Sequence, residues 1–363
     1  MISIGTGERR RRLQTRHLLT PSTRVDDIVA AADAMVALHA TDPATVFLAA
    51  WARTTSGPQT EMADEMYVQK RLVRMMAMRR TMFVVGDALA PVVQASSSLG
   101  VAAAQRKRLL TELTLAGVAP DVDAWLTDVC ESTVRALVAR GHAQATDLVA
   151  DEPRLNTMLD ISPGKSYGGL QKITSRVMTV LALEGKIVRG AALGGWTSNR
   201  NEWWPAEHWM PGGFGEVDPA AARIDLATRW LRTFGPAPID DLKWWTGWTL
   251  GQVRTALKSI DAVEVDLEGG SGLVLADDLG STPEPEPAVA LLPALDPTPM
   301  GWLGRDWFLG DHRSRLFDTN GNIGPTIFWQ GRIVGGWAQR PDGEIRTHLL
   351  QDIGSEATDA VGQ

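Results

Sequence analysis

A unit of three helices followed by one or two short strands recurs three times in the first 275 residues, and this repetition limits the possible folds more than any other feature. In the first copy, residues 24–41, 43–53 and 61–78 have helical patterns, and residues 81–85 are β-branched and aromatic. The order of these elements is that expected of a winged helix. Because the copies are unevenly spaced, they predict tandem modules and not a solenoid.

The second and third copies repeat this order. In the second, helices are predicted at 124–140, 145–149 and 169–184, Gly185 is the expected C-cap, and strands follow at 186–189 and 197–204. In the third, helices are predicted at 218–234, 239–245 and 249–260, and strands at 263–267 and 272–275. The short turn 246–248 makes the last helix pair typical of a helix–turn–helix. Trp244, Trp245 and Trp248 of this pair are predicted to pack between modules.

The pattern changes beyond residues 279–288, which are rich in proline and acidic residues and mark a boundary. Short strands are predicted at 289–292, 326–329, 332–337 and 345–348, and the last dozen residues are predicted to be frayed. The predicted fold is therefore mainly α with β wings (α+β). Its modules are a winged helix that opens with a helix pair at 1–120, two further winged helices at 121–217 and 218–280, and a small sheet or β-barrel at 287–352.

Composition excludes several classes of protein and site. The single cysteine, Cys130, excludes an intramolecular disulfide, a thiolate zinc site and an iron–sulfur cluster. The six histidines lack ligand spacing, and no phosphate-binding glycine loop, His-Glu-x-x-His helix or Gly-x-Ser-x-Gly elbow is present. We therefore expect no metal and no organic cofactor. No apolar run reaches membrane-spanning length or follows the basic N-terminus as a signal peptide would, so we expect a cytoplasmic, nucleoid-associated protein with no membrane partner.

The charge is distributed unevenly along the chain. Residues 1–90 have a net charge of +3, whereas residues 218–363 have a net charge of −9. Because nucleic acids are bound through phosphate contacts with Lys and Arg, a DNA-binding face is expected in the first third. The alternative for a run such as 9–12 is a solvated tail.

Several segments resemble the crosslink-repair DNA glycosylases of the AlkZ/YcaQ type. The similarity begins with ALHATDP at 37–43 and AWAR at 50–53. It keeps the same order through segments at 72–74, 78–81, 183–185, 239–247, 291–297 and 331–335. The resemblance implies three tandem winged helices and a C-terminal β-barrel wrapped as a C around DNA. It also implies a monomer that binds damaged double-stranded DNA.

The resemblance places a catalytic motif at the end of the second helix, where the family has Gln–hydrophobic–Gln or Gln–hydrophobic–Asp. The matching positions here hold His39, Ala40 and Thr41, a departure from that pattern. His39 is a candidate to accept a proton from water, Thr41 to orient that water, and Asp42 to offset positive charge that develops on the sugar. The alternative is structural: His39 ends a helix, and Thr41 or Asp42 caps the next one.

Arginines and lysines supply the candidate DNA contacts. The helix predicted at 61–78 would place Lys70, Arg71 and Arg74 on one face, with Arg79 and Arg80 at the following turn. The complete predicted set is Lys70, Arg71, Arg74, Arg79, Arg80, Arg200, Arg305 and Arg313, the last two in a strip of aromatic and basic residues at 302–315.

Three functions follow from these features. The first is a monofunctional DNA glycosylase that hydrolyses the N-glycosidic bond of bulky alkylated purines, as monoadducts or interstrand crosslinks. The second is a non-catalytic winged-helix DNA-binding protein, acting as a regulator or lesion sensor on the same scaffold. The third is an interaction scaffold whose acidic C-terminal half binds a basic partner.

Overall fold

A computed structural model describes residues 2–55, 59–161 and 168–362. The chain forms an α+β fold built from small separate sheets. The first region contains β1 (Ile2–Ser3), α1 (Thr6–Arg16), α2 (Ile28–Ala34), β2 (Leu38–His39), α3 (Pro43–Trp51), α4 (Gln59–Tyr67), β3 (Leu72–Met76) and β4 (Met82–Gly86). β4 is the central strand of an antiparallel sheet whose order is β2-β4-β3.

Two predictions for this region are wrong. The helix predicted at 24–41 ends at Ala34; Val36 has a φ of +63°, and the chain then enters β2. The helix predicted at 61–78 ends at Tyr67, and residues 72–76 are a strand paired with β4. β3 is buried along nearly its whole length. A strand that is apolar on both faces lacks the alternation that distinguishes it from a helix, so tertiary pairing decides its conformation.

The second region follows a long helical connection made of α5 (Ala90–Val93), a π-helical turn (Gln94–Ser98) and α6 (Leu99–Leu115). It contains α7 (Val122–Arg140), α8 (Ala145–Asp151), β5 (Met158–Ile161), β6 (Gly169–Lys172), α9 (Thr174–Leu183), β7 (Ile187–Ala192), β8 (Asn201–Pro205) and α10 (Ala206–Trp209). The helix predicted at 169–184 begins only at Thr174, because residues 169–172 pair with β5. Gly185 adopts a φ of +70° after α9, as predicted for a C-cap.

The third region contains α11 (Pro219–Phe234), α12 (Ile239–Thr246), α13 (Leu250–Leu257), β9 (Ala262–Leu267) and β10 (Gly270–Leu275). The predicted helix pair is present, and Gly247 between the two helices has a φ of +72°. The N-terminal β1 adds to this sheet, parallel to β9. The first residues of the chain therefore complete the third region and not the first.

The C-terminal region contains four strands at nearly the predicted positions: β11 (Val289–Leu292), β12 (Thr326–Trp329), β13 (Arg332–Gln339) and β14 (Ile345–Leu349). Between β11 and β12 lie α14 (Asp306–Leu309) and α15 (Arg313–Leu316), and α16 (Ser355–Gly362) follows β14. The sheet is open, with the order β11-β12-β13-β14, so a closed barrel is wrong for the part of the chain described. Ala357 of α16 packs into the sheet's apolar cluster with Ile327, Trp329 and Val334, so a helix covers this face in place of barrel closure.

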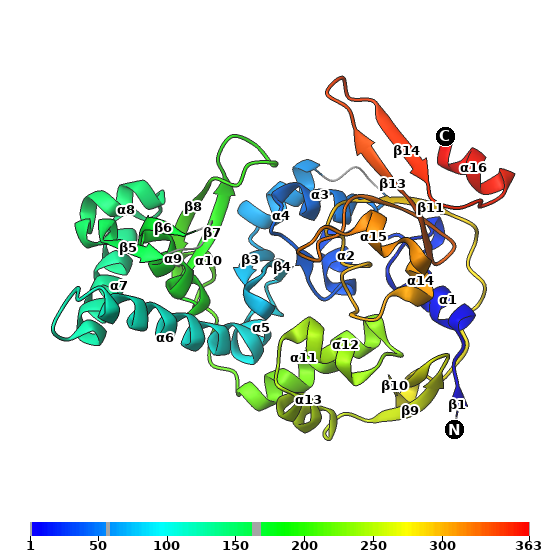
Figure 1. Ribbon diagram of the computed structural model, residues 1–363, viewed down its shortest axis with the longest axis horizontal. Helices are drawn as coiled ribbons and strands as arrows, with labels where there is room; N and C mark the ends of the chain where they lie inside the picture. Colours follow the sequence, from blue (N-terminus) through cyan, green and yellow to red (C-terminus); the bar gives the residue numbers. More distant parts are fainter. Residues whose placement is uncertain (1, 56–58, 162–167, 363) are drawn as a thin grey trace.

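A buried ion pair joins the first and last regions. Arg53, just after α3, donates to both carboxylate oxygens of Asp296 at 2.9 and 2.8 Å, and both side chains are 0% exposed. Figure 1 shows α7–α9 and β5–β8 at one end of the molecule, and α11–α13 and the C-terminal strands on the other side of the first region. The first region therefore lies between its neighbours.

Candidate functional site

His39 lies on a strand and not at the end of a helix. It belongs to β2, faces Phe83 in the sheet register and is 6% exposed. The amide of the next residue, Ala40, donates to the carbonyl of Met82 at 2.8 Å. The predicted helix-end role of His39 is therefore wrong, because sheet pairing fixes this segment.

The environment of the His39 ring keeps it neutral. Burial, and then the positive charge of Arg79, lower the pKa of His39 to about 4. The Phe83 ring packs edge-on at a centroid distance of 5.6 Å, and Nδ1 accepts a long hydrogen bond of 3.5 Å from the amide of Thr41. Because Nδ1 is the acceptor, the proton of the neutral ring is assigned to Nε2, which makes that atom a donor. The His39 ring is therefore uncharged at neutral pH.

Arg74 supports the same segment from the neighbouring part of the sheet. It is only 4% exposed, and its Nη2 donates to the carbonyl of Ala40 at 2.9 Å. The prediction that Arg74 shares an exposed helical face with Lys70 and Arg71 is wrong, since it lies on β3 with its guanidinium turned inward. This contact orients Arg74 toward the backbone between His39 and Thr41.

Thr41 and Asp42 emerge from the sheet into solvent. Asp42 accepts a hydrogen bond from the amide of Ala44 at 3.1 Å, and Pro43 occupies the first turn of α3. The structural alternative predicted for Asp42, an N-cap, is confirmed. Thr41 lines a pocket that begins where β2 ends.

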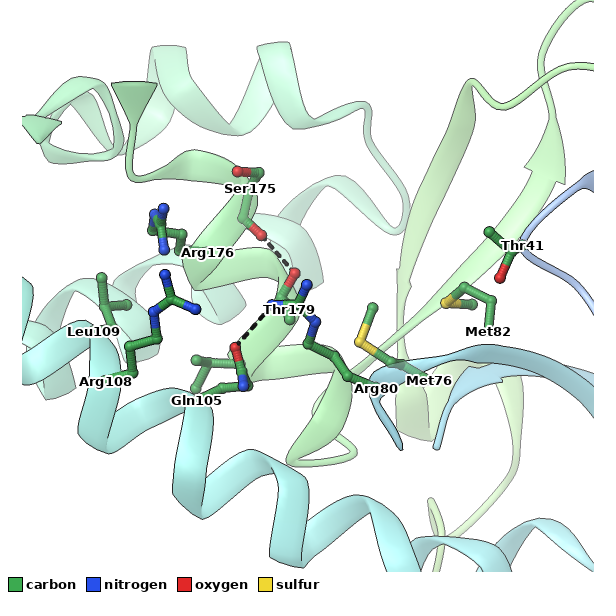
Figure 2. Close-up of a pocket in the computed structure, with 11 residues that line it drawn as sticks. Thr41, Met76, Arg80, Met82, Gln105, Arg108, Leu109, Ser175, Arg176 and Thr179 are labelled. Carbon is green, nitrogen blue, oxygen red and sulfur yellow. Dashed lines mark hydrogen bonds between the residues drawn. The ribbon is translucent and has the colours of Figure 1, made fainter. Parts of the chain in front are cut away.

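This pocket has a volume of about 370 Å³ and is rich in arginine (Figure 2). Besides Thr41, the turn before β4 and helices α6 and α9 provide its lining: Met76, Arg80, Met82, Gln105, Arg108, Leu109, Ser175, Arg176, Thr179 and Val180. Arg80 donates to the side chain of Gln105 at 3.3 Å. Arg108 and Arg176 both pair with Glu112, at 2.9 and 3.0 Å. No acidic residue is among the described side chains that line the pocket.

Sequence analysis identified only Thr41 and Arg80 of this lining. Arg108 and Arg176 lie on two helices that are far apart in the sequence, and neither belongs to a motif. Their proximity results from the packing of α6 on α9. The only signal in the sequence is that both are basic residues on predominantly apolar helices.

Lys70 and Arg71 each have a partner within the protein. The Lys70 ammonium lies 5.0 and 4.9 Å from the ring centroids of Trp204 and Trp209 and donates to the carbonyl of His208 at 3.3 Å. Arg71 is exposed and donates from Nε to Glu65 at 2.7 Å. The two side chains therefore do not form one basic face with Arg74.

The remaining predicted DNA contacts are dispersed. Arg79 and Arg80 are exposed in the turn between β3 and β4, and both have a positive φ. Arg200 is exposed between β7 and β8, Arg313 is exposed on α15, and Arg305 is only 2% exposed. The prediction that Arg305 is available at the surface is therefore wrong for the protein without DNA, because neighbouring side chains cover Arg305.

Among the described residues, no group of three or more His, Cys, Asp or Glu side chains is arranged to hold a metal ion. Within the same residues, no helix is both long and apolar enough to cross a membrane.

Comparison with known proteins gives a sequence family and a similar solved structure. The sequence model of the family described as "DNA glycosylase AlkZ-like" matches residues 32–363. Among solved structures, the chain is similar to the Streptomyces sahachiroi DNA glycosylase AlkZ, with a TM-score of 0.76 and 20% sequence identity. The match covers 99% of this chain and 94% of that one. No curated protein sequence matches the chain.

Proposed function

The chain belongs to the AlkZ-like DNA glycosylase family, and we propose that it hydrolyses the N-glycosidic bond of bulky alkylated purines in double-stranded DNA. Monoadducts and interstrand crosslinks are the proposed substrates. The observation that carries this proposal is the position of Thr41 and Asp42. Both are exposed directly after a buried strand, and Thr41 lies at the edge of a pocket lined by three arginines.

In the proposed reaction the protein does not have to activate the leaving base. A purine alkylated at N7 or N3 is cationic, so it departs readily and leaves an oxocarbenium-like sugar. The Asp42 carboxylate offsets this positive charge, and the Thr41 hydroxyl orients the attacking water. His39 is a positioning residue, because its Nδ1 accepts from the Thr41 amide and its low pKa makes it a weak base.

We further propose that residues 1–120, 121–217 and 218–280 are three winged helices. In the first region the order is α2, β2, α3, α4, β3 and β4. The second and third regions repeat it, with the short first strand reduced to one bridge, between Ala143 and Trp203 and between Ala237 and Leu273. In the second region the β5–β6 hairpin is inserted between the second and third helices. This order supports the proposal, since a winged helix places its first strand between its first two helices. Residues 287–352 would form the open sheet that completes the molecule.

The DNA contacts proposed next to the reaction come from the arginine-lined pocket. Arg80, Arg108 and Arg176 supply positive charge from three separate elements. α9, which carries Arg176, is the third helix of the second winged helix, the element that commonly meets the duplex. Arg200, exposed in the wing of the same module, is proposed to contact an adjacent phosphate.

A non-catalytic lesion sensor is the second candidate function. The lack of acidic residues among the described lining of the pocket favours it, because such a lining suits phosphate binding without proton transfer. A sensor would bind alkylated duplex more tightly than undamaged duplex and leave every glycosidic bond intact.

Base release from an N7-alkylguanine duplex separates the two functions. The duplex is incubated with the protein or with buffer alone and then treated with mild alkali, which cleaves the strand at abasic sites, so cleavage above the buffer control reports release by the protein. We expect strand cleavage at the alkylated guanine and none in the undamaged duplex. Tight binding to the alkylated duplex without cleavage would establish the sensor instead.

Replacement of Asp42 by Asn tests the proposed chemistry. Asn caps helices about as well as Asp, so Asp42→Asn removes the charge while α3 keeps its cap. We expect excision to fall by about 10²–10³-fold, the range for loss of one electrostatic contact to a transition state. Asp27→Asn is the matched control, because Asp27 caps α2 through the amide of Val29 at 2.9 Å. Equal excision by both variants would contradict the role of Asp42.

A further inference from the structure

Three arginines and two aromatic rings form one continuous stack outside the pocket. The Arg79 guanidinium lies 4.1 Å from the ring centroid of Trp244, and the Arg305 guanidinium lies 4.7 Å from the same ring. Arg305 also lies 4.8 Å from the Phe317 ring, and Arg313 lies 5.4 Å from that ring. Cations and rings therefore alternate through the whole arginine–aromatic stack, Arg79–Trp244–Arg305–Phe317–Arg313.

The stack joins elements that are distant in the sequence. Arg79 comes from the turn between β3 and β4, Trp244 from α12, and Arg305 and Arg313 from the segment around α14 and α15. Gly247 allows the close approach of α12, because a Cβ there would lie 2.8 Å from Cγ of Arg79. The two terminal arginines are exposed, whereas the central Arg305 is 2% exposed.

The positive charge of the stack lacks a matching anion. Among the described residues, no carboxylate lies within 4.0 Å of its three guanidinium groups, and Nε and Nη2 of the central one, Arg305, are buried without a hydrogen-bond partner. The buried carboxylate of Asp241 lies near Arg305 and offsets part of its charge without pairing with it, since Oδ1 accepts from the amides of Leu303 and Gly304 at 2.9 and 2.8 Å and Oδ2 has no hydrogen-bond partner.

A buried, unpaired guanidinium destabilises the protein unless something binds it, because arginine does not lose its proton at neutral pH. Burial, together with the neighbouring charges of Arg313 and Arg79, lowers the pKa of Arg305 to about 10, and the charge of Asp241 opposes this shift. The rings on either side hold Arg305 in place between them, and the exposed Arg79 and Arg313 at the two ends keep their N–H donors open to a ligand. Such a stack fits a ligand with several regularly spaced anionic oxygens.

We propose that the arginine–aromatic stack binds consecutive phosphates of the DNA backbone, as a contact separate from the arginine-lined pocket. This inference rests on the proposed function and assigns the path of the duplex beyond the reacting nucleotide. DNA is favoured over other polyanions by continuity, because Arg79 adjoins Arg80, which lines the pocket next to Thr41. The backbone would run from the pocket, over Trp244 and Phe317, to α15.

Salt titrations of duplex binding test the stack. The probe is a fluorescently labelled, undamaged 20-base-pair duplex, measured by anisotropy with the wild type, Arg313→Ala and Arg305→Met. Each lost phosphate contact lowers the slope of log K against log salt by about 0.9, or about eight-fold in affinity at 0.1 M salt. We expect this loss for Arg313→Ala, which removes an exposed contact, and a smaller loss for Arg305→Met, because the buried Arg305 acts by holding the Trp244 and Phe317 rings and by its charge. Arg135→Met is the control, because Arg135 is exposed on α7, away from the stack, and lies 3.8 Å from Glu131.

Thermal unfolding of the Arg305→Met variant distinguishes ligand binding from a structural role. Replacing an unpaired buried charge by an apolar chain of similar volume should leave the melting temperature unchanged or raise it. If Arg305 serves only the fold, Arg305→Met melts lower and binds duplex with the wild-type salt slope, which would overturn the proposal. The proposal would also be overturned if the two variants lost affinity for double-stranded RNA but bound double-stranded DNA as tightly as the wild type.

Base excision separates this inference from the proposed function. With subsaturating protein, base release by both stack variants should fall in step with their duplex affinity, and raising the protein concentration should recover it, because the reacting residues are unchanged. A wild type that releases no base, while the variants still show the reduced salt slope, would refute the glycosylase assignment and leave the stack in place. Wild-type salt slopes in both variants, with normal excision, would refute only the stack.

Discussion

The low pKa of His39 predicts a specific dependence of folding stability on pH. In the folded chain burial lowers this pKa to about 4, whereas an unfolded histidine titrates near 6.5. Between these values the unfolded state binds a proton that the folded state does not, so stability falls as the pH falls. The contribution of His39 is complete above about pH 6.5 and is lost progressively toward pH 4.

The size of this effect follows from the two pKa values. The full difference corresponds to about 3 kcal/mol, and about 2 kcal/mol of it is already lost at pH 5. The comparison is wild type against His39→Gln, because Gln cannot titrate. His17 is fully buried and its pKa is also lowered, but it is present in both proteins and cancels in the difference.

Urea unfolding at pH 7.5, 6.0 and 5.0 measures the difference in unfolding free energy between the two proteins. Between pH 7.5 and 5.0 we expect the unfolding free energy of His39→Gln to rise by about 2 kcal/mol relative to that of the wild type. His348→Gln, at an exposed position on β14, is the control and should show a much smaller shift. A difference that stays constant with pH would refute the burial argument.

The rate of base excision by the wild type should also be independent of pH from 5.5 to 8, whereas a general base with an unperturbed pKa requires the rate to rise near pH 6.5.

Three further predictions concern the scaffold and the site. Asp296→Ala should lower the free energy of unfolding by about 3–5 kcal/mol in urea titrations, because it leaves Arg53 charged and unpaired at 0% exposure; a loss below 1 kcal/mol would contradict this. Gly247→Ala should cost about 1–3 kcal/mol, measured in the same way, since its φ is +72° and the new Cβ would press on Arg79; an unchanged midpoint would show that the turn relaxes freely. Thr41→Val should slow base excision while the melting temperature stays within a few degrees of wild type, and normal excision would remove Thr41 from the mechanism.

Local signals in the sequence were sufficient for many elements. The Asp42-Pro43 pair predicts the start of α3, and Asp42 caps it as expected. The short β-branched and aromatic runs at 289–292 and 326–329 are strands at the predicted positions. These predictions succeeded because capping and strand propensity act within a few residues, where the sequence contains all the interacting partners.

The predictions that were wrong depended on distant partners. Residues 72–76 show no alternation of polar and apolar side chains, because both faces of β3 are buried. From the sequence alone this segment therefore resembles part of a helix, and only its pairing with β4 identifies it as a strand. The C-terminal strands were identified, but the sequence does not show that α16 covers their apolar face and that the sheet stays open. In both cases burial on a second face, which only tertiary packing supplies, decided the outcome.

The sequence by itself determined the order of most helices and strands, the basic first third and the segment from His39 to Asp42 that carries the proposed chemistry. Only the tertiary structure placed His39 in a buried strand and lowered its pKa. It alone brought Arg108 and Arg176 to the pocket beside Thr41. The physical reason is that pKa values and electrostatic sites depend on burial and on distances through space, and charges far apart along the chain set both.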